Sequence, residues 1–443
     1  RAHTLAAAEL GVPLDAGATA IFSRNLYLSS FVERFQLAKA RDAAQVLGLW
    51  DGAGFRFRWP EGSLLPVRML SRYGLSPLRV IKAVSTAVDR LCKVYQLQAN
   101  GRSWASPGEL FESLGLYNLT QVSAYEYFET MLHVSPKFVR ELVDGASRDN
   151  YNQDGHINAF VDLVSLAGAG IGGSVFGLAN GTTQIAEALL ASSPKISPRL
   201  ATTVTKVEHR YTDSGSARFR LTTARDDRSV RAPNVSKASF ESGGRPNLLE
   251  YESYDAVVIA TPLETSHRLE LVGAPSALNT SRPYQQTYVT FVCGSVSAAY
   301  FGLPAASAVP TEMLTVENTS LPFSTLAVHA SLQNGSHVFK LFSRRPIDEA
   351  VLDQIFTTRH RTRRVDWPAA YTRLLPSPTA SWPQFEIWLS PTADGDLPRN
   401  PPPTRPILYT GAMESAVSCM ETQVIAAKNA ALRIEAQLSQ LAS

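Results

Sequence analysis

Apolar and polar residues alternate along this chain in patterns that predict both helices and strands. Apolar positions recur at helical spacing in residues 25–39 and 77–96, which predicts two helices. Residues 286–296, 324–332 and 336–343 contain β-branched and aromatic residues and predict strands of a mixed sheet. The pattern therefore indicates a chain that combines helices with sheet.

Two further segments predict strands that end in turns of small residues. In YDAVVIATPLE, residues 254–264, a short apolar run stops at Pro262 and predicts a buried strand of a parallel sheet. Residues 407–438 begin as a strand, pass through Gly411 and Glu414, and continue as a long alanine-rich helix. Residues 389–406, LSPTADGDLPRNPPPTRP, are turn-rich and predict an exposed loop.

A glycine-rich stretch at residues 164–190 allows two interpretations. Gly168, Gly170 and Gly173 have the spacing of a nucleotide-binding loop, which needs a strand before the glycines and an uninterrupted helix after them. A turn signal at Asn180 breaks the following segment, and the acid at the expected distance lies within a helical pattern. The alternative, which the sequence favours, is a chain that passes close to a flat group.

Composition and charge narrow the classes of protein. With 443 residues, of which 44% are hydrophobic and 18% charged, the chain can bury a full core and predicts two lobes. The net charge of +3 is too small to indicate a nucleic acid or a membrane surface as partner. The most apolar window, residues 157–179, contains Asp162 and several glycines, so we interpret it as buried core and expect no transmembrane segment.

The cysteines, histidines and glycosylation sequons indicate whether the protein binds a metal and which cellular compartment it occupies. Cys92, Cys293 and Cys419 are odd in number and widely spaced, which fits neither a disulfide framework nor a CxxC metal site. The eight histidines are scattered, and we predict no bound metal. Sequons for N-glycosylation favour the secretory route; they begin at Asn118, Asn180, Asn234, Asn279, Asn318 and Asn334.

Several segments, taken in order, resemble one family of flavoproteins. RDNYNQDGHINAFVDLVSLAGAG, YDAVVIATPLE and ILYTGAMESAVSCMETQVIAAKNAAL are similar to segments of the prenylcysteine oxidases, also called prenylcysteine lyases. These belong to the amine-oxidase-like FAD oxidoreductases, and the resemblance runs over nearly the whole chain. Arg1 and Thr4 match the last part of the family's GGR-x-x-T segment. The family's first strand, glycine loop and ribose-binding acid are therefore expected upstream of residue 1.

The resemblance implies an α/β fold in which a Rossmann-like FAD-binding domain is interleaved with an α+β substrate domain. The discontinuous FAD-binding domain would comprise residues 1–25, 155–270 and 400–443. The substrate domain, which would hold the prenyl tail, would comprise residues 26–154 and 271–399. Family resemblance and sequons together favour the secretory pathway, the lysosome or the vacuole.

The resemblance also assigns residues to the cofactor FAD, with plain packing as the alternative for each. Small residues would let the backbone approach the flavin ring, and a helix N-terminus would face the flavin carbonyl, where reduced flavin gathers negative charge. In chain order the implied residues are Arg1 and Thr4 near the phosphates or ribose, Gly17 and Ala18 at the ring, Val204 at the adenine, Ala260, Thr261 and Pro262 in the turn past the cofactor, Gly411 and Glu414 at the ribityl and pyrophosphate groups, and Met420 at the start of the helix.

One loop departs from the family pattern. Family members read E-G-G-N before a helix, whereas this chain has Ala179, Asn180, Gly181 and Thr182, so the acid is lost. The departure puts the geometry beside the flavin in question. Because Asn180 would lie against the cofactor, we expect its sequon to be unused.

The resemblance implies that the enzyme oxidises a prenylated thioether with molecular oxygen and water. Farnesyl- or geranylgeranylcysteine would yield a prenyl aldehyde, free cysteine and hydrogen peroxide, while the protein supplies orientation and a dry apolar pocket. Asn150, Tyr151 and Gln153 are candidates to line that pocket, or they only tie the two lobes together; no catalytic residue is identified. The alternatives are another amine-oxidase-like enzyme, and a structural or binding subunit without catalysis, which would show no flavin absorption.

Overall fold

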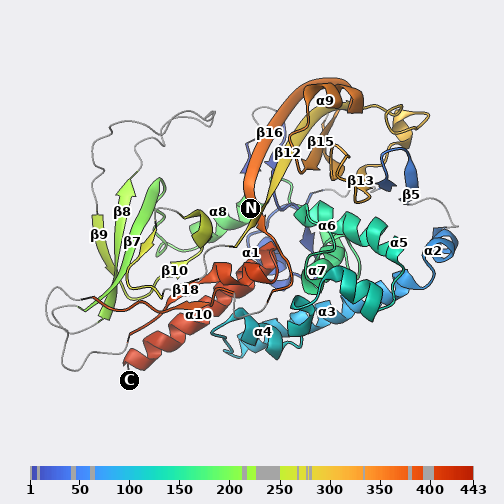
Figure 1. Ribbon diagram of the computed structural model, residues 1–443. Helices are drawn as coiled ribbons and strands as arrows, with labels where there is room; N and C mark the ends of the chain where they lie inside the picture. The colour runs from blue at the N-terminus through green and yellow to red at the C-terminus, as the bar shows by residue number, and fades with distance from the viewer. Residues whose placement is uncertain are drawn as a thin grey trace.

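The computed structural model places a large sheet with most of the helices at one end of the molecule and a smaller sheet at the other (Figure 1). The described residues are 2–6, 10–40, 46–59, 65–211, 217–225, 250–266, 269–275, 278, 282–332, 335–377, 382–392 and 404–442.

The largest sheet has seven strands and is mixed, as the sequence predicts. Neighbouring strands are antiparallel except for β13 and β4, which are parallel. Along β12, alternate residues face opposite sides: Val292 packs with Phe339 in one apolar cluster, and Phe291 packs with Leu14 in another. The strand order is β16 (Phe356–Thr372), β12 (Tyr284–Val296), β15 (His337–Ser343), β14 (Thr325–Ser331), β13 (Glu312–Thr315), β4 (Leu47–Trp50) and β5 (Phe55–Trp59).

A sheet of three short strands joins the two segments that end in small-residue turns. β10 (Val258–Ile259) pairs in parallel with β18 (Ile407–Tyr409), and β17 (Glu386–Ile387) pairs antiparallel with the other edge of β18. The parallel pairing confirms the prediction for residues 254–264. The expected burial was wrong for Val258, which is 41% exposed while Ile259 is buried, because only one side of this strand is covered.

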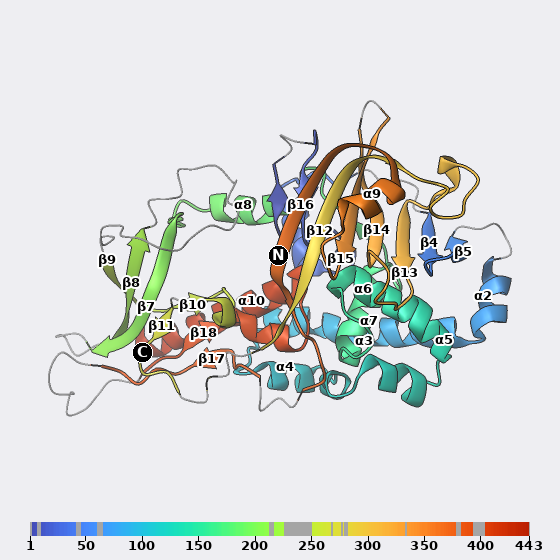
Figure 2. The same cartoon turned by 45° about the horizontal axis from the view of Figure 1, so that its top comes forward.

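The remaining strands form three small sheets. A four-stranded sheet carries the long hairpin of β7 and β8 at the far end of the molecule (Figure 2). The other two sheets are antiparallel pairs near the N-terminus. The strands are β11 (Glu270–Leu271), β7 (Thr202–Tyr211), β8 (Ala217–Arg225) and β9 (Glu250–Tyr254) in the first sheet, β1 (Thr4–Leu5) and β2 (Leu14–Asp15) in the second, and β3 (Ile21–Phe22) and β6 (Val175–Phe176) in the third.

Most of the helices lie below the large sheet in the view of Figure 1. The helix predicted at 77–96 is confirmed as α3, whereas the one predicted at 25–39 ends early, because Gln36 adopts a positive φ of 54° and Leu37 N–H donates to Val32 O. The helices are α1 (Leu26–Arg34), α2 (Leu65–Tyr73), α3 (Ser76–Ala99), α4 (Pro107–Ser113), α5 (Pro136–Phe138), α6 (Asp144–Tyr151), α7 (Ala159–Gly168), α8 (Thr183–Ala191), α9 (Glu349–Ile355) and α10 (Met420–Ala442).

One apolar core connects segments that the sequence assigns to two domains. Phe111 on α4, Phe160 on α7, Val207 on β7 and Ile407 on β18 all belong to the same buried cluster. The interior of α7 confirms that the apolar window at 157–179 begins as buried core. The domain boundaries themselves stay a prediction.

Candidate functional site

The carboxyl ends of β10 and β18 bring two of the predicted cofactor segments together. Because the strands are parallel and Ile259 lies opposite Tyr409, the turns that follow them leave the sheet at the same edge. Ala260 and Thr261 are exposed in the first turn. Gly411 follows Tyr409 so tightly that a Cβ would lie 2.5 Å from the Tyr409 hydroxyl oxygen. Glycine is therefore required here for space.

A buried arginine that the sequence did not single out holds these turns in place. Arg282 donates to Gly411 O at 2.9 Å and to the Tyr409 hydroxyl at 2.7 Å. It also forms an ion pair with Glu264, in the turn after Pro262. The two charged side chains are only 9% and 7% exposed. Arg282 thus ties the turn after β10 to the turn after β18.

The N-terminal segment forms a second group of predicted residues around Asp15. The Asp15 carboxylate accepts from the Thr4 hydroxyl at 2.6 Å and from Thr182 N–H at 3.1 Å. The Thr182 hydroxyl donates to Ala18 O at 2.9 Å. Gly181 has a φ of +85°, and a Cβ there would lie 2.3 Å from the Thr4 side chain. The ANGT segment that departs from the family pattern therefore anchors the N-terminal segment that carries Gly17 and Ala18.

The remaining predicted cofactor residues lie in several places. Val204 on β7 is half-buried against the main core, and Glu414 is buried, its backbone carbonyl accepting from the Thr372 hydroxyl at 2.6 Å. Met420 begins α10, as predicted, and packs against the small apolar cluster that contains Ile21 of β3. Arg1 lies outside the described residues. Of the sequons, Asn118, Asn180 and Asn318 are exposed, and the other three asparagines lie outside the described residues.

The predicted pocket residues on α6 and just after it have different surroundings. Asn150 donates to Ala146 O and to Ser165 on α7. Gln153 is fixed between Thr372 O and Leu374 N–H, at 3.0 and 3.1 Å. The Tyr151 side chain is buried, and its ring packs edge-on against the Tyr371 ring. Burial raises the pKa of the Tyr151 hydroxyl well above its usual value. The contacts of Asn150 and Gln153 agree with a tie between segments, while Tyr151 contributes a buried ring.

The glycine stretch follows a helix and leads into a strand. Gly168 is the last residue of α7, Gly170 has a φ of +89°, and β6 begins at Val175. A Cβ on Gly173 would lie 2.4 Å from the Phe22 ring. The strand and helix that a nucleotide loop needs are thus not at these glycines. The flat group that this part of the chain approaches in the structure is the ring of Phe22.

A group of charged side chains inside the molecule was missed by the sequence reasoning. Lys340 on β15 donates to Gly17 O at 3.0 Å and to the Thr19 hydroxyl at 3.1 Å. Glu312, Ala327 and Lys340 are directly opposite one another on β13, β14 and β15, so their side chains share one face of the sheet. The small Ala327 separates the acid from the lysine. This polar row lies on the face that residues 10–19 cover.

Asp149 adds a second acid above this face. It lies on α6, which packs against β13, and it interacts electrostatically with both Glu312 and Lys340. The Thr325 side chain contributes a hydrogen bond to Asp149. We call Asp149, Glu312 and Lys340 the interior charge cluster. All three residues are half-buried, so each keeps some accessible surface although it lies inside the protein.

Burial changes the titration of the interior charge cluster. It lowers the pKa of Lys340 to about 8, against the opposing effects of Asp15 and Asp149. It raises the pKa of Asp149, and it also raises that of Glu312, where repulsion from Asp149 adds to the effect. Burial, with Lys340 nearby, lowers the pKa of the neighbouring His329 to about 4. At neutral pH the cluster therefore has a charged lysine and two acids that resist ionising together.

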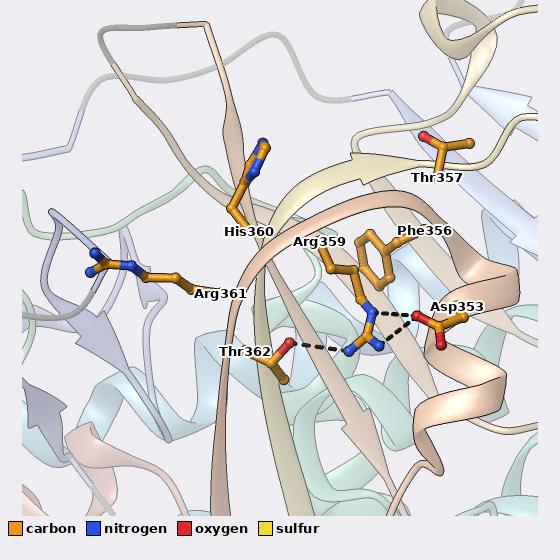
Figure 3. A pocket seen from close by; sticks show the side chains of 7 residues that line it. All are labelled: Asp353, Phe356, Thr357, Arg359, His360, Arg361 and Thr362. Carbon is orange, nitrogen blue, oxygen red and sulfur yellow. Dashed lines mark hydrogen bonds and ion pairs between the residues drawn. The ribbon is translucent and has the colours of Figure 1, made fainter.

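The open hollow in Figure 3 is a separate surface feature. It has a volume of about 460 Å³ and lies where α9 meets β16, with Asp353, Arg359, His360 and Thr362 among its lining residues. Arg359 is paired with Asp353 and hydrogen-bonds Thr362. None of the residues predicted to bind cofactor or substrate lines it.

Within the described ranges, no group of three or more His, Cys, Asp or Glu side chains is arranged to hold a metal ion. The three cysteines are free thiols. In the same part of the chain, no helix has both the length and the apolar character needed to cross a bilayer.

Solved structures with similar folds define the fold class. A putrescine oxidase variant, from work on the redesign of its cofactor binding, aligns with a TM-score of 0.57 at 12% identity, covering 98% of this chain and 91% of its own. Cyclohexylamine oxidase from Brevibacterium oxydans aligns with a TM-score of 0.53 at 13% identity, over 96% and 88% of the two chains. The fold is that of the amine-oxidase-like FAD oxidoreductases, a Rossmann-type α/β class.

Within that class, the chain belongs to the prenylcysteine lyase family, whose family model matches residues 64–442. Farnesylcysteine lyase of Arabidopsis thaliana is 26% identical over 95% of this chain and 77% of its own length. Human prenylcysteine oxidase 1-like is 25% identical over 94% of this chain and 79% of its own, and human prenylcysteine oxidase 1 is 23% identical over 95% and 79%. The family resemblance found in the sequence is confirmed.

Proposed function

We propose that this chain is an FAD-dependent thioether oxidase that cleaves prenylcysteine. The observation that carries the proposal is the meeting of two small-residue turns, at Ala260 and at Gly411, on the ends of the parallel strands β10 and β18. Ligands of open α/β sheets bind outside the carboxyl ends of such strands. Membership in the prenylcysteine lyase family supports a prenylated thioether as the substrate class.

The residues present fit the flavin end of an FAD group. The turn after β10 is small and exposed at Ala260 and Thr261, so a planar group can lie against its backbone. Gly411 keeps the neighbouring turn close to its strand, and Met420 opens a long helix whose N-terminus favours negative charge. We assign Gly17, Ala18, Ala260, Thr261 and Gly411 to the flavin and ribityl groups.

Bound FAD would supply a two-electron acceptor for oxidation of the allylic carbon bonded to sulfur, with oxygen as the final acceptor. Water adds to the sulfur-stabilised cation of the substrate, and the hemithioacetal splits. In sum, prenylcysteine, oxygen and water give a prenyl aldehyde, cysteine and hydrogen peroxide. The substrate therefore provides most of the electronic stabilisation, and the protein has to orient it and limit access of water.

The interior charge cluster is suited to hold the amino-acid end of the substrate. The cysteine end of prenylcysteine carries one ammonium and one carboxylate group. We place the ammonium near Asp149 and Glu312, and the carboxylate toward Lys340, which reaches the Gly17 segment assigned to the flavin. Ala327 leaves space between the acid and the lysine. Opposite charges at the two ends of this row would fix the direction in which the thioether enters.

A spectrum and a product assay test the proposal. We expect purified protein to bind FAD, to show flavin absorption, and to lose that absorption when farnesylcysteine is added without oxygen. With oxygen, equal amounts of peroxide and farnesyl aldehyde should appear. S-methylcysteine, which lacks the tail, and putrescine, an amine oxidase substrate, serve as controls. Protein that binds FAD but oxidises putrescine, or that leaves farnesylcysteine unchanged, would refute the assignment.

A further inference from the structure

Exposed apolar side chains are concentrated at the junction of α2 and α3. Five of the fifteen large apolar residues exposed in the described chain fall within the fifteen residues from 67 to 81, so the cluster is far from an even distribution. We call these five residues the α2–α3 patch. They are Val67, Leu70, Leu75, Leu78 and Ile81, between 45% and 64% exposed.

The fold does not use these side chains for its own core. On α2 the inward positions are Met69, which packs against the main core, and Tyr73, which is buried edge-on against the Phe138 ring. Val67 and Leu70 point outward from the same helix. Gly74, with a φ of +60°, lets α3 begin almost at once, so only a short turn separates the exposed residues of the two helices. Both figures show α2 at the end of the molecule, beyond β5 (Figures 1 and 2).

Basic residues surround the α2–α3 patch. Residues 56–82 contain six basic side chains and a single acid, and acids from outside this range, Asp51 and Glu141, pair with two of the six, Arg56 and Arg72. Arg68, Arg79 and Lys82 are exposed beside the apolar residues. An open hollow of about 390 Å³ adjoins them, and its lining mixes Phe55 and Leu303 with three arginines. The local surface therefore combines apolar contact with positive charge.

We propose that the α2–α3 patch docks the protein on an anionic lipid bilayer. Apolar residues on one side of a helix, flanked by lysine and arginine, suit the boundary between lipid head groups and acyl chains. Basic side chains beside them gain from anionic head groups. A second copy of the chain is disfavoured as the occupant, because it would bring Arg68, Arg79 and Lys82 against the same cations of its partner. The proposal does not depend on the chemistry at the flavin.

Vesicle sedimentation with the intact chain tests this docking. We expect binding to vesicles of phosphatidylcholine mixed with phosphatidylserine, much weaker binding to phosphatidylcholine alone, and a loss of binding at high salt. The triple variant Leu70→Ser, Leu75→Ser, Leu78→Ser should bind the anionic vesicles at least about tenfold more weakly than the unchanged protein. Changing Arg68→Gln and Lys82→Gln together should remove most of the preference for the anionic vesicles.

A matched control uses equally exposed leucines elsewhere. The triple variant Leu190→Ser, Leu200→Ser, Leu438→Ser removes side chains that are 41% to 84% exposed and should bind as the unchanged protein does. Thermal melting should show that both triple variants fold. The proposal is overturned if the unchanged protein ignores anionic vesicles, if the control loses binding equally, or if the patch variant binds normally. Sedimentation equilibrium that shows a dimer lost in the patch variant would assign the surface to a second copy instead.

Discussion

Removing the buried guanidinium of Arg282 should destabilise the protein by far more than removing an exposed one. The Arg282→Met variant leaves Glu264 in a site where its side chain is 7% exposed. Within the described ranges, its carboxylate would then accept from the Tyr284 hydroxyl alone, at 3.2 Å. The substitution also removes the donors to Gly411 O and to the Tyr409 hydroxyl. Breaking a buried ion pair by deleting one partner costs about 3–5 kcal/mol, and we expect a loss in that range.

A double-mutant cycle separates the ion pair from the other contacts. Glu264→Gln alone should cost about 3 kcal/mol, since it leaves the arginine charge buried. The double variant should cost roughly as much as one single change, because both charges are gone and what remains is about 1 kcal/mol for each lost hydrogen bond. The coupling between the two sites should therefore be on the order of 3 kcal/mol.

Urea unfolding followed by circular dichroism gives these free energies. Arg218→Met is the matched control: Arg218 also makes a two-point contact with a carboxylate, but the side chains of Arg218 and Asp255 are 41% and 56% exposed. Its loss should cost less than about 1 kcal/mol. Additive single changes at Arg282 and Glu264, or equal effects at Arg282 and Arg218, would show that the buried pair does not hold the two turns.

Three further changes test the site. Lys340→Met should raise the KM for farnesylcysteine with little change in kcat. In the unchanged enzyme, kcat/KM should fall above about pH 8, where the Lys340 ammonium loses its proton. Lys340→Arg should move this fall in kcat/KM to higher pH. Gly411→Ala should cost about 1–3 kcal/mol in urea unfolding and weaken FAD retention, because its Cβ would meet the Tyr409 hydroxyl, which Arg282 holds. Burial raises the pKa of Glu312 in the folded state, so the stability of the protein should decline as the pH rises from the unfolded-state pKa of Glu312 to its folded-state pKa. Glu312→Gln should therefore flatten the fall in Tm between pH 5 and 8. An equal fall in the variant and in the unchanged protein would contradict the assignment.

Periodicity predicted the local elements that bury one continuous face. Helix α3 and the strands β12, β14 and β15 lie close to their predicted ranges, because their apolar residues follow the helical or the two-residue period over many positions. The end of α1 was placed too late, since the reversal at Gln36 uses a positive φ that its residue type does not announce. Val258 was expected to be buried, but whether a strand is covered depends on segments distant in the sequence.

The candidate site could be predicted only in part, and the reason is sequence separation. The segments around Ala260 and Gly411 were found by resemblance, and their pairing followed from the parallel strands. Arg282 and Lys340 were missed, although Lys340 gave a signal: it occupies an inward position of a strand between Val338 and Phe342, which are buried. A lysine in that place needs partners, but nothing local indicates that they lie on residues 17 and 19.

The two missed residues are central to the proposed function, because each joins segments that are far apart in the sequence. Arg282 links the turns after β10 and β18, and Lys340 links the large sheet to the segment that carries Gly17 and Ala18. If FAD lies between these segments, both charges fix the cofactor relative to the substrate's amino-acid end. A variant that only loosens packing should then lower stability alone, whereas a variant at Lys340 should weaken binding of the thioether while the fold persists.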